Sequence, residues 1–371
     1  MTLRGKYSDK APARSCIMKR IAIFQSELSV GGIQKSLVNL LNSIDYKSFQ
    51  VDLYLSRRDK FWDVSFPDEL NIIYLKHTPR IFSFLPLDVS KKLLKYDFPA
   101  EKEYDLAVDF NSYQCSCAVG ALTVPAKRRV MWIHNDVLIK HRNEWKYRVL
   151  WFFFKDKFKY YDEFVPVSQA LIEPFKELSG MRDKKYTVIE NVINVAEIQE
   201  KMLLEPEGLQ LEENCLNFVA LGRLCHQKGY DIMLEEFSKA CRHRDDLRLY
   251  IIGDGPDQTA LEQEAKSKGL ENKVIFLGRK ENPYCYMNRM DAFISTSRYE
   301  GQPLNIMEAM AVGLPLYCSK NLEAYTDGLV GRDDIAAALV KAKREEKRPD
   351  DLKEYNNRIL NEVAKLANSA E

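Results

Sequence analysis

The chain has 371 residues, of which 46% are hydrophobic, and its 55 Lys and Arg are balanced by 54 Asp and Glu. This length predicts two domains rather than one small core, and the balanced charge gives no reason to expect a nucleic-acid partner. The eight cysteines are scattered without the spacing of a zinc site, and no apolar stretch is long enough to span a bilayer, so we expect a cytoplasmic protein.

The first part of the chain alternates strand-like and helix-like patterns. Residues 1–18 are polar and basic, and we expect a disordered extension there. An amphipathic helix is predicted at 33–41. Buried strands are predicted at 21–24, 51–55, 71–75, 106–110, 130–133 and 164–167. Strands that alternate with helices indicate a parallel, doubly wound sheet.

Two features lie where such a sheet would hold a ligand. Gly31 and Gly32 follow the first strand, where paired glycines let the backbone approach a ligand beside a helix N-terminus. A plain turn would show the same pair. His134 comes directly after the strand 130–133, at the edge where doubly wound folds bind ligands, although a lone histidine is usually structural.

The stretch 145–161 interleaves aromatic and basic residues over about four helical turns. Such a helix can lie on an anionic membrane surface, with its rings in the interface and its lysines near the headgroups. The residues assigned to that surface are Trp151, Phe154, Phe158, Tyr161, Lys155, Lys157 and Lys159. The alternative is core packing under the sheet, which we favour for Val149, Phe152 and Phe153.

The second part of the chain alternates in the same way. After a polar stretch at 205–214, strands are predicted at 216–221, 249–252, 274–278 and 292–294. The loop after the first of these strands carries Arg223 and Lys228. Two cations between a strand and a helix suit a diphosphate, which Arg can bind through two parallel hydrogen bonds. From Asp333 to the end the sequence is charged and predicted to be helical.

The most informative segment is 295–315. Pro303 suits the first turn of a helix and Gly313 the position just past its end, which bounds one short helix. Its apolar residues predict that the helix is buried, so Glu308 inside it needs a partner. Glu300 stands just before the same helix, and a ligand rich in hydroxyl groups would satisfy both carboxylates.

This segment resembles the signature S-x-x-E-G-x-P-x-x-x-x-E-A-M-A-x-G-x-P of the retaining, GT-B-fold glycosyltransferases of family 4. The matching positions are Ser297, Glu300, Gly301, Pro303, Glu308, Ala309, Met310, Gly313 and Pro315. Three other stretches fit the same family. Residues 31–37 resemble its glycine-pair loop, 222–229 its G-R-L-x-x-x-K-G pattern, and 188–194 its interdomain segment, with Val192 in place of the usual glycine.

The resemblance implies an α/β protein of two Rossmann-like, doubly wound domains that face a cleft. The domains would be residues 19–192, the acceptor side, and 193–340, the nucleotide-sugar side. Residues 341–371 would form a helical tail, and the sequence leaves open whether this tail crosses back to the first domain.

The resemblance also implies an activity, the transfer of a sugar from a nucleoside diphosphate sugar, with a UDP-sugar favoured, to an acceptor hydroxyl. Retention of configuration is expected, and no cofactor or metal, since the chain lacks an Asp-x-Asp motif for Mg²⁺. The catalytic residues would be His134 and Glu300 at the sugar, with Arg223 and Lys228 at the leaving diphosphate. The donor would further contact Glu308 through its ribose, and Gly31, Gly32, Gly301, Gln302, Pro303, Leu304 and Asn305.

The family's common work in bacteria implies a glycan or lipid-linked acceptor in surface polysaccharide synthesis. Asn135 and Asp136 are alternative acceptor contacts, and a peripheral position on the inner face of the plasma membrane depends on 145–161. Two rival interpretations stay open. One is a sugar-nucleotide epimerase or a sucrose- or trehalose-type synthase of the same fold, and the other is a catalytically silent scaffold that binds nucleotide sugar.

Overall fold

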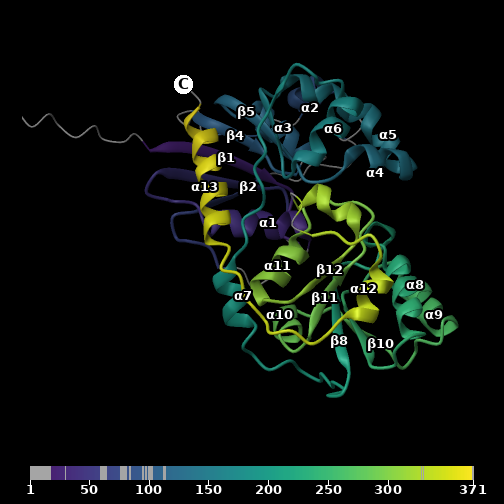
Figure 1. The fold of residues 1–371 in the computed structure, drawn as a ribbon. Coiled ribbons are helices and arrows are strands. Elements are labelled where there is room, and N and C mark those ends of the chain that lie inside the picture. Colours follow the sequence, from purple (N-terminus) through teal and green to yellow (C-terminus); the bar gives the residue numbers. More distant parts are fainter. Residues whose placement is uncertain are drawn as a thin grey trace, which may run out of the picture.

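The computed structural model describes residues 18–29, 31–58, 65–75, 82, 85–93, 96, 98, 103–111, 114–326, 328 and 330–369. Except for Met18, the extension expected at 1–18 lies outside these residues. The described chain forms two sheet-containing domains, one above the other in Figure 1, and the C-terminal helix runs along the side of the first.

The first domain holds a parallel seven-stranded sheet in the order β3-β2-β1-β4-β5-β6-β7. Its strands are β1 (Lys19–Gln25), β2 (Phe49–Leu55), β3 (Asn71–Tyr74), β4 (Tyr104–Asp109), β5 (Ala126–Ile133), β6 (Glu163–Pro166) and β7 (Lys185–Tyr186). Its helices are α1 (Gly32–Leu41), α2 (Leu87–Leu93), α3 (Cys115–Thr123), α4 (Val137–Asn143), α5 (Trp145–Phe154) and α6 (Ile172–Ser179), with the 3₁₀ helices η2 (Lys155–Tyr160) and η3 (Gln169–Leu171). The central strands are apolar runs because helices cover both faces of the sheet.

The second domain holds a parallel five-stranded sheet in the order β10-β9-β8-β11-β12. Its strands are β8 (Leu216–Leu221), β9 (Leu247–Ile252), β10 (Val274–Gly278), β11 (Ala292–Ser295) and β12 (Leu316–Cys318). Its helices are α7 (Val195–Lys201), α8 (Tyr230–Cys241), α9 (Gln258–Ser267), α10 (Pro283–Met287), α11 (Leu304–Val312) and α12 (Ile335–Lys341), with η4 (His226–Lys228) and η5 (Lys320–Tyr325).

The prediction of two doubly wound α/β domains is confirmed by this strand order. In both sheets the order reverses beside the first strand, between β1 and β4 and between β8 and β11. Open parallel sheets bind ligands outside the carboxyl ends of their strands at such a reversal. The two reversal points therefore mark where the functional side chains should be sought.

The C-terminal tail is not one continuous helix. The prediction of helical sequence from Asp333 onward was wrong for residues 342–352, which have no regular secondary structure between α12 and α13 (Lys353–Asn368). Pro349 lies in this stretch and is incompatible with a helix interior. Helix α13 then packs beside β1 of the first domain, where Arg128 of β5 donates to the carbonyl of Leu366 at 3.1 Å (Figure 1).

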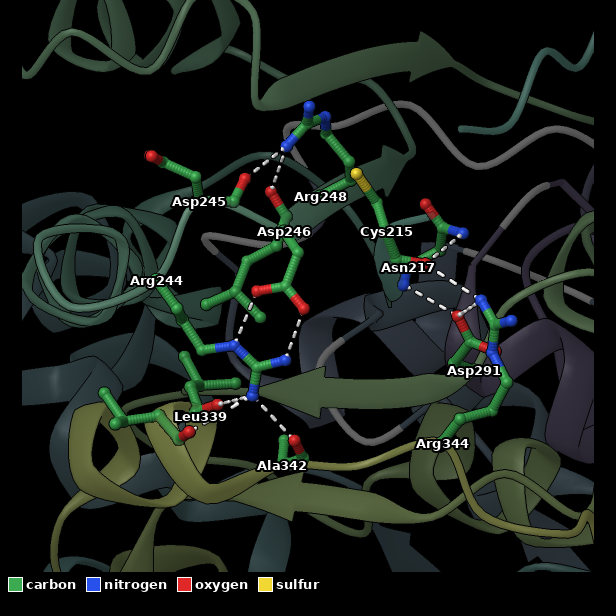
Figure 2. Close-up of polar contacts among 12 residues, drawn as sticks. Cys215, Asn217, Arg244, Asp245, Asp246, Arg248, Asp291, Leu339, Ala342 and Arg344 are labelled. Carbon is green, nitrogen blue, oxygen red and sulfur yellow. Dashed lines mark hydrogen bonds and ion pairs between the residues drawn. The ribbon is translucent and has the colours of Figure 1, made fainter. Parts of the chain in front are cut away.

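Two arginines hold the start of the segment 342–352 against the second domain (Figure 2). Arg244, after α8, donates to the carbonyl of Ala342 at 2.6 Å. Arg344 donates to Asp291 at 2.8 Å, and Asp291 in turn accepts from the main-chain N–H of Asn217 at 2.8 Å. The tail is therefore fixed to the second domain before it crosses to the first.

The structure reverses the faces expected for the segment 145–161. Trp151, Phe158 and Tyr161, which were assigned to a membrane surface, are buried, and so is Lys157. Trp151 and Phe158 pack their rings against each other and against Phe175 of α6, which explains why this face turns inward. The side chain of Phe154 lies outside the described part of the chain.

The opposite face of α5 is exposed. The assignment of Val149 and Phe152 to the core was wrong, because their exposed fractions are 45% and 65%, and Trp145 is 64% exposed. Phe153, also assigned to the core, is half-buried. The spacing of Trp145, Val149 and Phe152 places them on one side of the helix.

Candidate functional site

The N-termini of two helices from different domains meet at the domain boundary. Gly31 precedes α1, Gly32 begins it and Leu304 begins α11, on the two sides of the boundary in Figure 1. A Cβ added to Gly32 would stand 4.0 Å from Leu304 Cδ1. Neither helix has an acidic residue in its first turn or a side-chain cap. Helix N-termini carry partial positive charge and bind anions readily, so both ends suit a phosphate.

The loops after β8 and β11 are joined by an ion pair. Lys228 Nζ lies 2.7 Å from Glu300 Oε1, and Gln227 donates to the carbonyl of Tyr299 at 3.1 Å. The loops approach closely because Gly229 has φ +64°, and a Cβ there would stand 2.2 Å from a main-chain oxygen. Two residues predicted to act at one site, Lys228 and Glu300, are thus brought together.

Arg223 lies in the same loop and is exposed. It forms no hydrogen bond or ion pair with any residue that the structure describes. Asn305 at the start of α11 donates to the carbonyl of Leu221 at 2.7 Å, which ties the helix N-terminus to the end of β8 just before Arg223. Arg223 therefore lies in the loop between the end of β8, which contacts the start of α11, and Lys228.

Gly301 connects this loop to the first domain. A Cβ added to Gly301 would stand 1.8 Å from the carbonyl oxygen of His134, so only glycine fits. The carbonyl of Gly301 also accepts a hydrogen bond from Ser168 Oγ at 2.7 Å. The ends of β5 and β6 thus contact the loop that carries Glu300, a contact that sequence reasoning missed for Ser168.

His134 is buried, and its ring centroid lies 4.6 Å from that of Phe110. Burial lowers the pKa of His134 to about 3, although a hydrogen bond with the Phe110 main chain acts in the opposite direction. Its Nε2 atom has no hydrogen-bond partner among the described residues. His134 is therefore a neutral imidazole at pH 7 with one nitrogen left for a ligand.

Glu308 is buried in α11, as predicted, and its partners come from both domains. Tyr284 of α10 donates to Glu308 Oε1 at 3.2 Å, and Lys35 of α1 contacts the same oxygen and the Tyr284 hydroxyl. Sequence reasoning missed Lys35 and Tyr284. The sequence did place Lys35 in the first turns of the helix after the glycine pair, and this position was the one signal that could have indicated its role.

Several other predicted residues use their side chains within the protein. Gln302 Oε1 accepts from the main-chain N–H of Asn191 at 2.6 Å, and its amide nitrogen donates to the Tyr355 hydroxyl of α13. Pro303 is the residue before α11 rather than part of its first turn, which corrects the prediction. Asp136 caps α4 through Leu138 and Ile139. The side chain of Gln302 is therefore occupied by these partners within the protein.

A separate hollow of 1030 Å³ lies between α8, α12 and η5. Of its cations, Lys239, Arg298 and Lys320 are each paired with a carboxylate. Among the described residues, no group of three or more His, Cys, Asp or Glu side chains is placed to hold a metal ion. None of the described helices has the length and apolar character needed to cross a membrane.

Residues 204–362 match the family of glycosyl transferases group 1, a stretch that runs from the start of the second domain into α13. The putative glycosyltransferase EpsF of Bacillus subtilis is 23% identical over 348 residues, which cover 86% of this chain and 85% of that protein.

A second relative is the N-acetylgalactosamine-N,N'-diacetylbacillosaminyl-diphospho-undecaprenol 4-alpha-N-acetylgalactosaminyltransferase of Campylobacter jejuni. It is 27% identical over 174 residues, or 47% of this chain and 45% of that protein. The chain spans about half the length of this relative and of the uncharacterized glycosyltransferase MJ1059 of Methanocaldococcus jannaschii.

Among solved structures, HepE of Anabaena in complex with UDP superposes with a TM-score of 0.58. The match covers 95% of both chains at 17% identity. The GT-B glycosyltransferase fold expected from the sequence is thereby confirmed.

Proposed function

We propose that the protein is a glycosyltransferase that moves a sugar from a nucleoside diphosphate sugar to an acceptor hydroxyl between its two domains. The observation that carries this proposal is that the N-termini of α1 and α11 meet at the domain boundary, while Arg223 and the Lys228–Glu300 pair lie on the loops that follow β8 and β11. These groups offer positive charge from both domains to one anion. The UDP complex of HepE supports UDP as the nucleotide.

Cleavage of the bond between the sugar and the diphosphate leaves negative charge on the diphosphate. Arg223, Lys228 and the N–H groups of the two helices stabilise that charge. Glu300 lies within reach of the sugar when Lys228 turns to the phosphate. His134 stays neutral and accepts one hydrogen bond through Nε2, because its other ring nitrogen donates to the Phe110 main chain, and this bond orients the sugar.

The reaction retains the anomeric configuration and needs no metal in this proposal. Retention rests on the resemblance of residues 295–315 to retaining enzymes, and metal independence rests on the cations that take the place of Mg²⁺ at the diphosphate. NMR of the anomeric proton of the product tests the first, and transfer in the presence of EDTA tests the second. A product with inverted anomeric configuration would refute retention. Loss of transfer in EDTA that Mg²⁺ restores would refute metal independence.

The acceptor is a glycan or a lipid-linked glycan, which the Campylobacter relative's name supports through its diphospho-undecaprenol acceptor. The exposed face of α5 offers the matching surface. We define this face, which continues from α5 into η2, as Trp145, Val149 and Phe152 with the exposed Arg148 of α5 and Lys155 and Lys159 of η2. Apolar side chains flanked by cations fit an anionic lipid surface, so the enzyme docks on the inner face of the plasma membrane from the cytoplasm.

Nucleotide release separates this proposal from its rivals. A transferase releases UDP from its donor rapidly only when an acceptor is present. An epimerase converts one sugar nucleotide into another without an acceptor and releases no UDP. A sucrose- or trehalose-type synthase releases the nucleotide only with a free sugar or sugar phosphate as acceptor. A silent scaffold binds the sugar nucleotide without releasing UDP. A screen of nucleotide sugars by thermal shift first identifies the donor, and the release assay is then run with and without glycan acceptors.

A further inference from the structure

Lys35 reaches from the first domain to the carboxylate of Glu308 in the second. Its Nζ contacts Glu308 Oε1 and the Tyr284 hydroxyl, and lies 4.8 Å from the centroid of the Tyr284 ring. The side chains of Lys35 and Glu308 are 19% and 6% exposed. Because a largely buried charge is costly without a partner, Glu308 Oε1 stays paired with Lys35. This pairing restricts the orientation of the Glu308 carboxylate.

The two oxygens of Glu308 have different surroundings. Oε1 accepts from Lys35 and from Tyr284, the latter at 3.2 Å. Oε2 accepts no hydrogen bond from any residue that the structure describes. A carboxylate has about four sites for hydrogen-bond donors, so Oε2 keeps its capacity for a ligand.

We infer that Lys35 is a positioning residue for ribose recognition: with Tyr284 it holds Oε1 of Glu308, so that Oε2 faces the hydroxyls of the donor's ribose. This inference rests on the proposed function, because it needs a nucleotide at Glu308. Since Lys35 belongs to α1 and Glu308 to α11, recognition of the ribose also depends on the two domains being together.

The charge state of Lys35 agrees with this role. Burial lowers the pKa of Lys35, but the nearby Glu308 and Tyr284 act in the opposite direction and leave it raised overall. Lys35 is therefore a cation at neutral pH, as its contact with Glu308 Oε1 requires.

Helix α1 supplies a matched control on the same face. Asn39 donates to the carbonyl of Val192 at 2.9 Å, and Ser36 contacts the Asn191 side chain. Both bonds join α1 to the interdomain segment without touching Glu308. Asn39→Ala therefore weakens the domain contact while leaving the two oxygens of Glu308 as they are.

The experiment measures affinity for UDP and for 2′,3′-dideoxy-UDP by calorimetry in the full-length wild type, Lys35→Met, Lys35→Arg, Tyr284→Phe and Asn39→Ala. The wild type should prefer UDP by about tenfold or more, as expected for a hydrogen bond to a charged group. Lys35→Met should remove most of this preference by weakening UDP binding, with little effect on the dideoxy nucleotide. Lys35→Arg should restore part of it, Tyr284→Phe should reduce it, and Asn39→Ala should keep it.

The outcomes separate the inference from the function on which it rests. Equal weakening of both nucleotides in Lys35→Met would mean that Lys35 serves the fold or the phosphates, and would overturn the inference. Loss of the preference in Asn39→Ala would assign the effect to the domain contact and overturn it as well. Wild-type protein that binds neither nucleotide would refute the proposed function itself.

Discussion

Gly301 lies so close to the main chain of His134 that a Cβ added to the glycine would stand 1.8 Å from the His134 carbonyl oxygen. The glycine is not needed for a left-handed backbone, since its φ is not among the positive ones. It is needed because two domains touch there. The loop that carries Glu300 is thereby placed against the end of β5, and any side chain at 301 pushes the two apart.

Gly301→Ala should therefore reduce activity strongly. The added methyl group meets backbone rather than a movable side chain, so the loop or the domain contact must shift, and a displacement of about 1 Å at a reacting group can cost about 100-fold in rate. The check is kcat/KM together with the melting temperature. Gly180→Ala is the control, because that glycine has φ +74° but open space around it. Activity of Gly301→Ala close to that of Gly180→Ala would contradict the assigned contact.

The sequence predicted the strands better than it predicted which side chains meet. Strand positions follow from local apolar runs, and β8 and β10 were predicted at the bounds the structure shows. The need of Glu308 for a partner was also predicted from its place in an apolar helix. The partner, Lys35, lies 273 residues away along the chain, and no local pattern reports such a contact.

For the segment 145–161, the sequence did not predict which side of the helix is buried. Its periodicity indicates a two-sided helix but not which side faces the protein, because both sides carry large rings. Trp151 and Phe158 face the protein because their rings pack against Phe175 of α6. The position of α6, a separate helix, cannot be inferred from the local pattern of 145–161. Three-dimensional packing, not composition, decided the buried face.

Arg223→Ala should lower kcat by about 100-fold or more, because it removes a positive charge from the leaving diphosphate. Stability should be unchanged, since Arg223 has no partner among the described residues. Lys228→Ala should also lower kcat, and it should reduce stability because it leaves the buried Glu300 unpaired. Arg182→Ala, at an exposed arginine of the first domain, is the control. Rates within a few tens of percent of wild type for both variants would disprove the diphosphate assignment.

His134 should make the protein less stable in mild acid. Burial lowers its folded-state pKa to about 3, while the unfolded chain keeps the ordinary value of 6.5. As the pH falls from 6.5 towards 3, the unfolded state binds a proton that the folded state does not, so stability is lost over this window. Between pH 7 and pH 5 the loss due to this residue is about 2 kcal/mol.

Urea unfolding of wild type and His134→Gln at pH 7 and pH 5 measures this contribution. The other histidines titrate in both proteins, so the difference between the two pH dependences reports His134. The variant should lose about 2 kcal/mol less than wild type between the two pH values. Identical pH dependences would show that His134 is as easily protonated in the folded state as in the unfolded chain.

The exposed face of α5 should bind anionic membranes weakly and reversibly. Its cations contribute on the order of 1 kcal/mol each near anionic lipid, while Trp145 and Phe152 insert apolar area. Sedimentation with vesicles should therefore increase with anionic lipid and decrease with salt. Changing Arg148, Lys155 and Lys159 together to Glu should abolish it, and Trp145→Ser with Phe152→Ser should weaken it.

Lys157 must be left intact in this test, because its buried side chain would make a charge reversal disrupt the fold rather than the surface. The control is Leu203→Ser with Leu204→Ser, which removes two exposed apolar side chains of the second domain. If the leucine variant loses sedimentation as much as the α5 variants do, apolar surface in general is responsible. If wild type fails to sediment with anionic vesicles at low salt, α5 does not dock on a membrane, and a water-soluble acceptor becomes the better hypothesis.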